Sequence, residues 1–246
     1  MTLPVVVPAR CPRDPAGNLD EKAIAGYASR LSATWVDYIL VSGSAGGGQN
    51  LDADQRGRVL DLWLDVAPPG RLIAACWSRQ DVAAALTRTV QPMIVLQDLP
   101  DRRVALQLLA SLPVGAYVYS HPRYTTITLD PVLAHSAASA GVLPAGAKVS
   151  KVPTGDIAAL RKACGLEFDL WHGSARDISG SIDAGASAVV VTALADLPDP
   201  FPPKGVAALQ ALVDAHAPGA ASAAASSPAV SDPPSSQVSS ATRASH

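Results

Sequence analysis

The sequence predicts a single (β/α)8 barrel, also called a TIM barrel, on three observations. Eight short apolar runs are each followed by a segment of helical periodicity, and such alternation indicates a parallel sheet. The composition is 48% hydrophobic but only 4% aromatic, which is typical of strands buried on both faces by aliphatic side chains. Residues 1–216 suffice for one barrel, and eight units favour a closed barrel over an open doubly wound sheet.

The expected strands are the apolar runs themselves. They lie at Leu3–Val7, Val36–Val41, Leu72–Cys76, Met93–Leu96, Val114–Tyr119, Ala147–Lys151, Phe168–Trp171 and Ala188–Val191. Helix signals follow in order. An apolar stripe from Ala23 to Leu31 predicts the first helix. Asp52 with Gln55 resembles a capping box, and Asp130 before Pro131 resembles an N-cap.

Two further helices complete the alternation. Ile178 and Ile182 share a helical face that we expect to end at Gly185, and the last helix is expected at about residues 205–216. Residues 217–246 contain nine alanines, nine serines and four prolines. Such a segment buries too little apolar surface to offset its ordering entropy, so we expect a disordered tail outside the barrel domain.

The overall composition excludes several classes of protein. A formal net charge of −2 without a basic run argues against a nucleic-acid partner. No apolar stretch is as long as a membrane span, and the N-terminus lacks the features of a signal peptide. Cys11, Cys76 and Cys164 are scattered and odd in number, which suggests neither a disulfide framework nor a metal site. We therefore expect a cytoplasmic protein without a metal.

Lys151 is the first candidate for catalysis. It ends the sixth expected strand, and the carboxyl end of barrel strands is where such enzymes carry their active sites. A desolvated lysine there can lose its proton and attack a carbonyl to form a Schiff base. Lys148 competes for this role, but lies three residues earlier and so faces the opposite side of a regular strand. We expect Lys151 at the barrel mouth and Lys148 directed away from the lumen.

Two neighbouring strand ends supply possible partners for this lysine. Tyr119 ends the fifth strand and is a candidate proton carrier, although packing is the commoner role of a strand tyrosine. The second strand runs into a glycine-rich turn, Ser42 to Gly48, whose backbone N–H groups can face an anion. The turn does not match a dinucleotide or Walker motif, so a small carboxylate is the better candidate ligand. A plain turn without a ligand remains the alternative.

At these residues the chain resembles the dihydrodipicolinate synthase / N-acetylneuraminate lyase family of pyruvate-dependent class I aldolases. The stretches that carry the likeness are Ala16–Asp20, Gly43–Gly47, Tyr119–Thr125, Leu129–Pro131, Lys151–Asp156, Trp171–Gly173 and Asp183–Ala186. The resemblance implies a (β/α)8 barrel in which Lys151 forms the Schiff base and Tyr119 transfers protons. It also implies that Gly43, Ser44, Ala45 and Gly46 hold the carboxylate and that Arg123 contributes to substrate binding.

The sequence departs from the family pattern in several places. Ala45 lacks the second hydroxyl of the carboxylate-binding loop, and Gly47 replaces a glutamate. The family's arginine after the tyrosine falls on Tyr124, with Arg123 one place early. The segment after the fourth strand is short and lacks the tyrosine that completes a proton relay between subunits in the synthases. These departures put the second substrate in doubt.

The leading hypothesis is therefore a lyase or aldolase that forms a lysine Schiff base with pyruvate or a related 2-oxo acid. It needs no cofactor, and a homo-oligomer is possible. A non-catalytic binding or regulatory protein on the same scaffold is the alternative. A phosphate-binding barrel isomerase is a third hypothesis, disfavoured because such barrels usually bind phosphate after strands seven and eight, where Thr192–Leu194 offers little.

Overall fold

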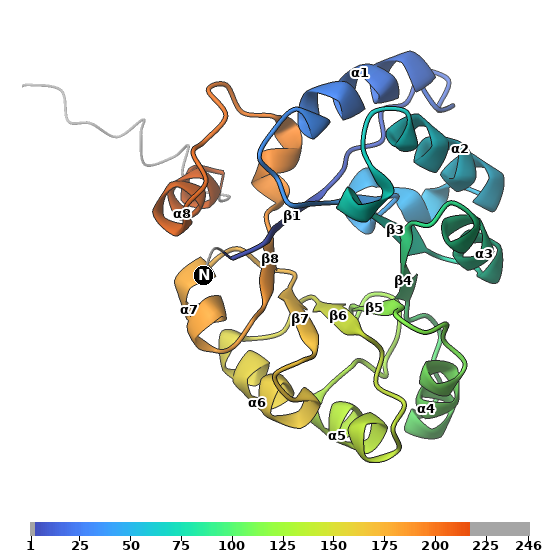
Figure 1. Ribbon diagram of the computed structural model, residues 1–246, viewed down its shortest axis with the longest axis vertical. Helices are drawn as coiled ribbons and strands as arrows, with labels where there is room; N and C mark the ends of the chain where they lie inside the picture. Colours follow the sequence, from blue (N-terminus) through green and yellow to red (C-terminus); the bar gives the residue numbers. More distant parts are fainter. Residues whose placement is uncertain (1–2, 217–246) are drawn as a thin grey trace, which may run out of the picture.

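Within residues 3–216, which are those described by this computed structural model, eight parallel strands close into one barrel (Figure 1). Each strand pairs with the next, and β8 pairs with β1. The strands are β1 (Val5–Pro8), β2 (Tyr38–Val41), β3 (Leu72–Cys76), β4 (Gln91–Val95), β5 (Tyr117–Ser120), β6 (Gly146–Val149), β7 (Asp169–His172) and β8 (Ala188–Val190). The predicted fold class is confirmed.

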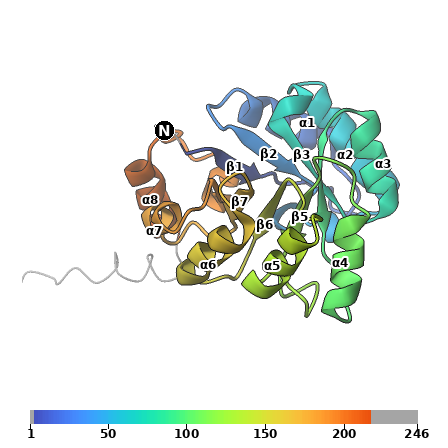
Figure 2. The same cartoon turned by 60° about the horizontal axis from the view of Figure 1, so that its bottom comes forward.

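The helices surround the barrel, and α8 lies beside α7 in both views (Figures 1 and 2). They are α1 (Glu21–Ser32), α2 (Ala53–Leu64), α3 (Arg79–Thr87), α4 (Arg102–Ala110), α5 (Pro131–Ser139), α6 (Thr154–Cys164), α7 (Ile178–Asp183) and α8 (Val206–Ala215). Short 3-10 turns occur at η1 (Ser44–Gly46), η2 (Gly48–Asn50), η3 (Pro69–Arg71) and η4 (Thr192–Asp196). None of the helices in the described part of the chain is long and apolar enough to cross a bilayer.

Aspartate side chains start several helices, as the sequence predicts for two of them. Asp52 accepts the N–H of Gln55 at 2.8 Å, and the Gln55 side chain accepts the Asp52 amide at 3.1 Å, which completes the capping box. Asp130 accepts the N–H of Leu133 at 2.7 Å, with Pro131 at the first helical position. Loss of such a cap typically costs about 1 kcal/mol. The caps therefore fix where the chain turns from each strand-end loop into its helix.

The apolar core has an inner and an outer layer. Side chains including Val6, Leu40 and Met93 form one cluster inside the barrel. Two outer clusters lie between strands and helices, one centred on β1 to β3 and the other on β5 to β7. Strand residues alternate between these layers, as expected for a period of two. Tyr119 belongs to the inner cluster, and Tyr117, two residues earlier on the same side of β5, packs against it.

The difference from the expected elements that bears most on the site is at β6. We expected a strand from Ala147 to Lys151, but β6 ends at Val149. Lys151 has φ 60°, in the left-handed region, so the extended conformation has ended before this residue. The alternation of sides therefore cannot be counted back from Lys151. The tail expected at 217–246 lies outside the described residues.

Candidate active site

Lys148 points into the barrel. Its neighbours Ala147 and Val149 belong to the outer cluster, so Lys148 faces the lumen by alternation. Strand register places it between Tyr119 of β5 and Trp171 of β7, which both belong to the inner cluster. The side chain is only 4% exposed. The expectation that Lys148 is directed away from the lumen is therefore wrong, because it assumed a strand that continues to Lys151.

The environment of Lys148 favours the neutral amine. Its Nζ lies 4.2 Å from the centroid of the Tyr119 ring, and no ion pair within residues 3–216 includes it. Desolvation by burial lowers the pKa of Lys148 to about 8. Burial disfavours an ammonium ion because its charge loses water and gains no carboxylate in return. With that pKa, about a tenth of the amine is unprotonated at pH 7, far more than for an exposed lysine.

Tyr119 brings together hydroxyl groups from two other strand ends. Its hydroxyl and the Ser44 Oγ share a hydrogen bond of 3.1 Å. Burial raises the pKa of Tyr119, and hydrogen bonds with Ser44 and Ser150 partly oppose that rise. Ser150 is itself buried directly after β6. Three hydroxyls therefore meet beside the Lys148 amine, an arrangement that can move a proton at this point.

The glycine-rich turn after β2 forms one wall. Ser44 and Ala45 line the cavity. Their backbone N–H groups, at the start of η1, have no hydrogen-bond acceptor within residues 3–216. Gly43 and Gly46 serve the turn itself, since the Gly46 N–H donates to the Gly43 carbonyl at 3.1 Å. A Cβ on Gly46 would lie 2.4 Å from the carbonyl oxygen of Ala9, so only glycine fits there without a backbone shift. The glycines thus let the turn pack closely against the end of β1.

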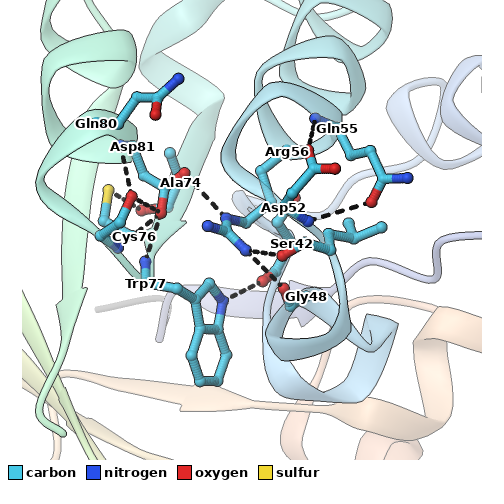
Figure 3. Close-up of polar contacts among 12 residues, drawn as sticks. Ser42, Gly48, Asp52, Gln55, Arg56, Ala74, Cys76, Trp77, Gln80 and Asp81 are labelled. Atoms are coloured by element: carbon cyan, nitrogen blue, oxygen red, sulfur yellow. Dashed lines mark hydrogen bonds and ion pairs between the residues drawn. The ribbon is translucent and has the colours of Figure 1, made fainter.

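A buried ion pair supports this turn from below (Figure 3). Arg56 of α2 donates from Nε to Asp81 of α3 at 2.9 Å and from Nη1 to the carbonyls of Gly48 and Leu51. Asp81 also accepts the backbone N–H of Trp77 at 2.8 Å.

The indole of Trp77 in turn donates to the Ser42 carbonyl at 2.9 Å (Figure 3). The residues that carry this network come from α2, α3 and the end of β3. They hold both ends of the segment that presents Ser44.

These groups open onto one cavity of about 680 Å³ at the carboxyl end of the barrel. Its wall includes Ser44, Tyr119, Lys148 and Ser150, and cationic groups stand around its mouth: Arg123, Lys151 and Arg176. Lys151, the nucleophile expected from the sequence, is exposed at this mouth. Ser44, Ala45, Tyr119, Arg123 and Lys151 are thus brought to one cavity, whereas Gly43 and Gly46 lie behind its wall.

The barrel fold is similar to those of several solved aldolases and of a dihydrodipicolinate synthase. The sialic acid aldolase of Ruminococcus gnavus superimposes with a TM-score of 0.70 at 19% identity, covering 81% of this chain and 71% of that one. The 2-keto 3-deoxygluconate aldolase of Picrophilus torridus gives 0.69 at 19% identity, covering 82% and 77%. Dihydrodipicolinate synthase from Agrobacterium tumefaciens gives 0.69 at 17% identity, covering 80% and 75%.

The chain has the fold of the dihydrodipicolinate synthases and sialic acid aldolases. The resemblance noted in the sequence is thereby confirmed at the level of the fold. No protein-family model matches the sequence. No curated protein matches it either. At such identities the shared barrel does not carry a residue's role from one protein to another, so the roles proposed below rest on this chain's own geometry.

Sequence reasoning missed the orientation of Lys148, although one signal for it was present. Gly146 stands two residues before Lys148, at the start of β6, and a glycine is unusual in a strand. In the structure a Cβ on Gly146 would lie 2.6 Å from the Asp169 Cβ and from the Asp169 carbonyl oxygen. Glycine is therefore required where β6 starts, two residues before the inward lysine.

His172 of β7 is a further titratable group at the cavity wall. It is buried, and its Nε2 donates to the Val152 carbonyl at 3.0 Å. Its Nδ1 lies 2.7 Å from the Ser181 Oγ. Burial lowers the pKa of His172, so the ring is neutral at pH 7. Its observed role is to hold the segment that follows Lys151.

The site offers no cluster suited to a metal ion. Among residues 3–216 no three His, Cys, Asp or Glu side chains gather in that way. The cysteines are free, and burial raises the pKa of Cys76 to about 12 and of Cys164 to about 11, which keeps both as thiols. The groups at the cavity wall that can take part in chemistry include the Lys148 amine, the hydroxyls of Ser44, Tyr119 and Ser150, two histidines and one carboxylate.

Proposed function

We propose that this protein is a lyase or aldolase that forms a Schiff base between Lys148 and pyruvate or a related 2-oxo acid. One observation carries the proposal: a buried lysine amine without a counterion faces a cavity beside a tyrosine hydroxyl network. An amine must be neutral to attack a carbonyl, and burial supplies that condition. Lys148 thus replaces Lys151, which the sequence favoured, as the proposed nucleophile.

The turn after β2 is the proposed site for the carboxylate of the 2-oxo acid. The unpartnered amides of Ser44 and Ala45 and the Ser44 hydroxyl lie at the cavity wall. Such donors stabilise a carboxylate without adding another charge. Because Ser44 also hydrogen-bonds to Tyr119, the same contact that holds the carboxylate places the acid's carbonyl near the proton donor.

The proposed reaction then has two proton-transfer steps. The neutral Lys148 amine adds to the C2 carbonyl, and the carbonyl oxygen ends as the hydroxyl of a carbinolamine. That hydroxyl leaves as water when Tyr119 donates a proton to it, which leaves a protonated imine. The tyrosinate regains its proton from water in the cavity, relayed through the Ser44 hydroxyl that hydrogen-bonds to it. The same tyrosine is then available for the proton moved in carbon–carbon bond formation or cleavage.

Two structural neighbours support this chemistry. A structure of the Ruminococcus gnavus sialic acid aldolase was determined as a catalytic lysine mutant. A variant of the 2-keto-3-deoxygluconate aldolase of Sulfolobus solfataricus was determined in complex with pyruvate. A lysine and a 2-oxo acid therefore belong to the chemistry of barrels of this shape, and Lys148 and the Ser44 turn are where this chain offers places for them.

Reductive trapping tests the proposal directly. The folded protein is incubated with pyruvate and borohydride, and the modified residue is identified by peptide mass mapping. We expect one reduced adduct, on Lys148, in the wild type and in Lys151→Ala. Lys148→Ala should give none.

Each contrary result has a defined meaning. An adduct on Lys151 that survives Lys148→Ala would overturn the choice of nucleophile. If pyruvate and other 2-oxo acids all fail to modify the folded wild type, the aldolase proposal fails. The alternative, a binding or regulatory protein on this scaffold, then takes its place. The lost hydroxyl at Ala45 is the observation that favours that alternative.

A further inference from the structure

We infer that the mouth of this cavity binds a phosphate monoester, so that the second substrate is a short phosphorylated aldehyde. The inference rests on the proposed function, since it names the partner of the lysine-bound 2-oxo acid. Three cationic side chains carry it: Arg123, Lys151 and Arg176.

The three cations stand on neighbouring loops. Arg123 follows β5, Lys151 follows β6 and Arg176 follows β7, and these strands are adjacent in the barrel. Neighbouring strands lie about 4.8 Å apart, so groups on their loops can reach one ligand. All three side chains line the same cavity as Lys148 and Tyr119. The positive charge is therefore placed around a single opening.

None of these cations is neutralised by a carboxylate in the described part of the chain. The ion pairs found there involve other residues. Asp177 is the only acidic residue of the cavity wall, and its carboxylate accepts the Gly180 N–H as the N-cap of α7. The wall thus has Arg123, Lys148, Lys151 and Arg176 against one carboxylate, in a chain whose formal net charge is −2.

The backbone beside each cation is anchored by a side chain. The Arg123 N–H donates to His121 Nδ1 at 2.9 Å. The Arg176 carbonyl accepts from Gln210 of α8 at 2.9 Å, and the bond from His172 to Val152 holds the residue next to Lys151. Fixed backbones reduce the entropy lost when the cations close on an anion.

The number of cationic side chains, and their position at the cavity mouth above Lys148, indicate the class of ligand. A single carboxylate is satisfied by one guanidinium, whereas a phosphate monoester carries a charge of about −1.5 to −2 and three acceptor oxygens. Lys148 lies within β6, whereas Lys151 follows the end of that strand and is exposed at the cavity mouth. A 2-oxo acid bonded at Lys148 and joined to a short aldehyde would extend from the buried amine toward these mouth cations. The mouth is thus suited to the distal end of the substrate.

Binding of a non-reactive probe tests this inference independently of catalysis. Calorimetric titration compares glycerol 3-phosphate, glycerol and succinate on the wild type and on Arg123→Ser, Lys151→Ser and Arg176→Ser. Lys22→Ser removes an exposed cation of α1 outside the cavity wall and serves as the matched control. We expect glycerol 3-phosphate to bind and glycerol not to bind. Each mouth variant should weaken the phosphate ester about tenfold or more, and raised salt should weaken it further.

The outcomes separate the two proposals. Failure of glycerol 3-phosphate to bind, or equal affinity in the mouth variants and Lys22→Ser, would overturn the phosphate inference. Tighter binding of succinate would replace the phosphate with a carboxylated substrate. Pyruvate trapping on the same wild-type sample reports on the aldolase chemistry alone. Trapping without phosphate binding would leave the proposed function standing and remove only the inference about the mouth.

Discussion

The amine of Lys148 lies 4.2 Å from the centre of the Tyr119 ring. A cation over the face of an aromatic ring is attracted by the ring's quadrupole. That attraction favours the ammonium form, whereas desolvation by burial lowers the pKa of Lys148 to about 8. The ring and the burial therefore act in opposite directions on the protonation of the same amine.

Replacement of the tyrosine hydroxyl should slow imine formation without preventing it. In Tyr119→Phe the ring that faces Lys148 is retained and the proton donor is lost. We expect the rate of imine formation to fall about 10²–10⁴-fold, as is usual for loss of a proton-transfer group. The rate is measured by quenching with borohydride at successive times and quantifying the adduct. An unchanged rate would show that another group carries the proton.

Ser150 should act on the acidity of Tyr119. Its hydrogen bond lowers the pKa of that phenol, so Ser150→Ala should move the Tyr119 titration to higher pH. We expect the pH profile of imine formation to shift in the same direction, with little change in pyruvate affinity. Ser44→Ala should shift the profile too, but should also weaken pyruvate binding because Ser44 lines the carboxylate turn. Identical effects of the two variants would contradict this division of roles.

Burial of the Lys148 amine should lower the unfolding free energy of the protein, and replacement of Lys148 by a neutral side chain should restore it. The pKa of Lys148 falls from 10.5 to about 8 on folding, which corresponds to about 3 kcal/mol. Below pH 8 the lysine is protonated in both states and the cost is complete. Between pH 8 and 10.5 the folded protein loses its proton first, so wild-type stability rises with pH. Lys148→Met should thus be more stable at pH 7, and its advantage should shrink by pH 10.

Urea unfolding at the two pH values measures this difference. Lys151→Met is the matched control, since that side chain is exposed and surface changes are usually within about 0.5 kcal/mol. A Lys148→Met protein that is less stable than the wild type at pH 7 would mean that the amine has a compensating partner.

The ion pair beneath the turn after β2 should matter for both stability and binding. Arg56 and Asp81 are 9% and 6% exposed. Removal of one partner leaves the other charge buried, so Arg56→Met should lose about 3–5 kcal/mol of unfolding free energy. Arg56→Met with Asp81→Asn should lose less than the sum of the two single changes. Because Arg56 also holds Gly48, pyruvate affinity should fall in the same variants, which titration can measure.

The closed barrel could be predicted because it depends on local patterns. Each of the eight apolar runs became a strand, and the capping box at Asp52 and the N-cap at Asp130 formed as expected. These signals act between residues close in the chain. The end of β6 could not be predicted, because the change to φ 60° at Lys151 has no marker such as glycine at that position.

Candidate site residues could be named from the sequence only where one strand end carries its own signal. Ser44 and Tyr119 were such candidates, and their hydroxyls are in contact in the structure. Ser150, His172 and Arg176 join the site through partners that lie elsewhere in the chain or through the shape of the cavity. Such contacts form only when the barrel closes, so no motif or fixed separation in the sequence marks them. The inward direction of Lys148 depended on the position of a strand end, which an error of two residues reverses.

The amino-terminal end of the barrel determines the order in which substrates bind and products leave. There the Tyr117 hydroxyl donates to Asp169, and Gly146 packs against Asp169 without space for a methyl group. A molecule that reaches Lys148 has therefore come through the opposite end and must leave by it. A molecule bonded to Lys148 therefore occupies the closed end of the cavity. A second molecule bound above it blocks its exit. Steady-state kinetics should accordingly be compulsory-ordered, with the 2-oxo acid first in during synthesis and last out during cleavage.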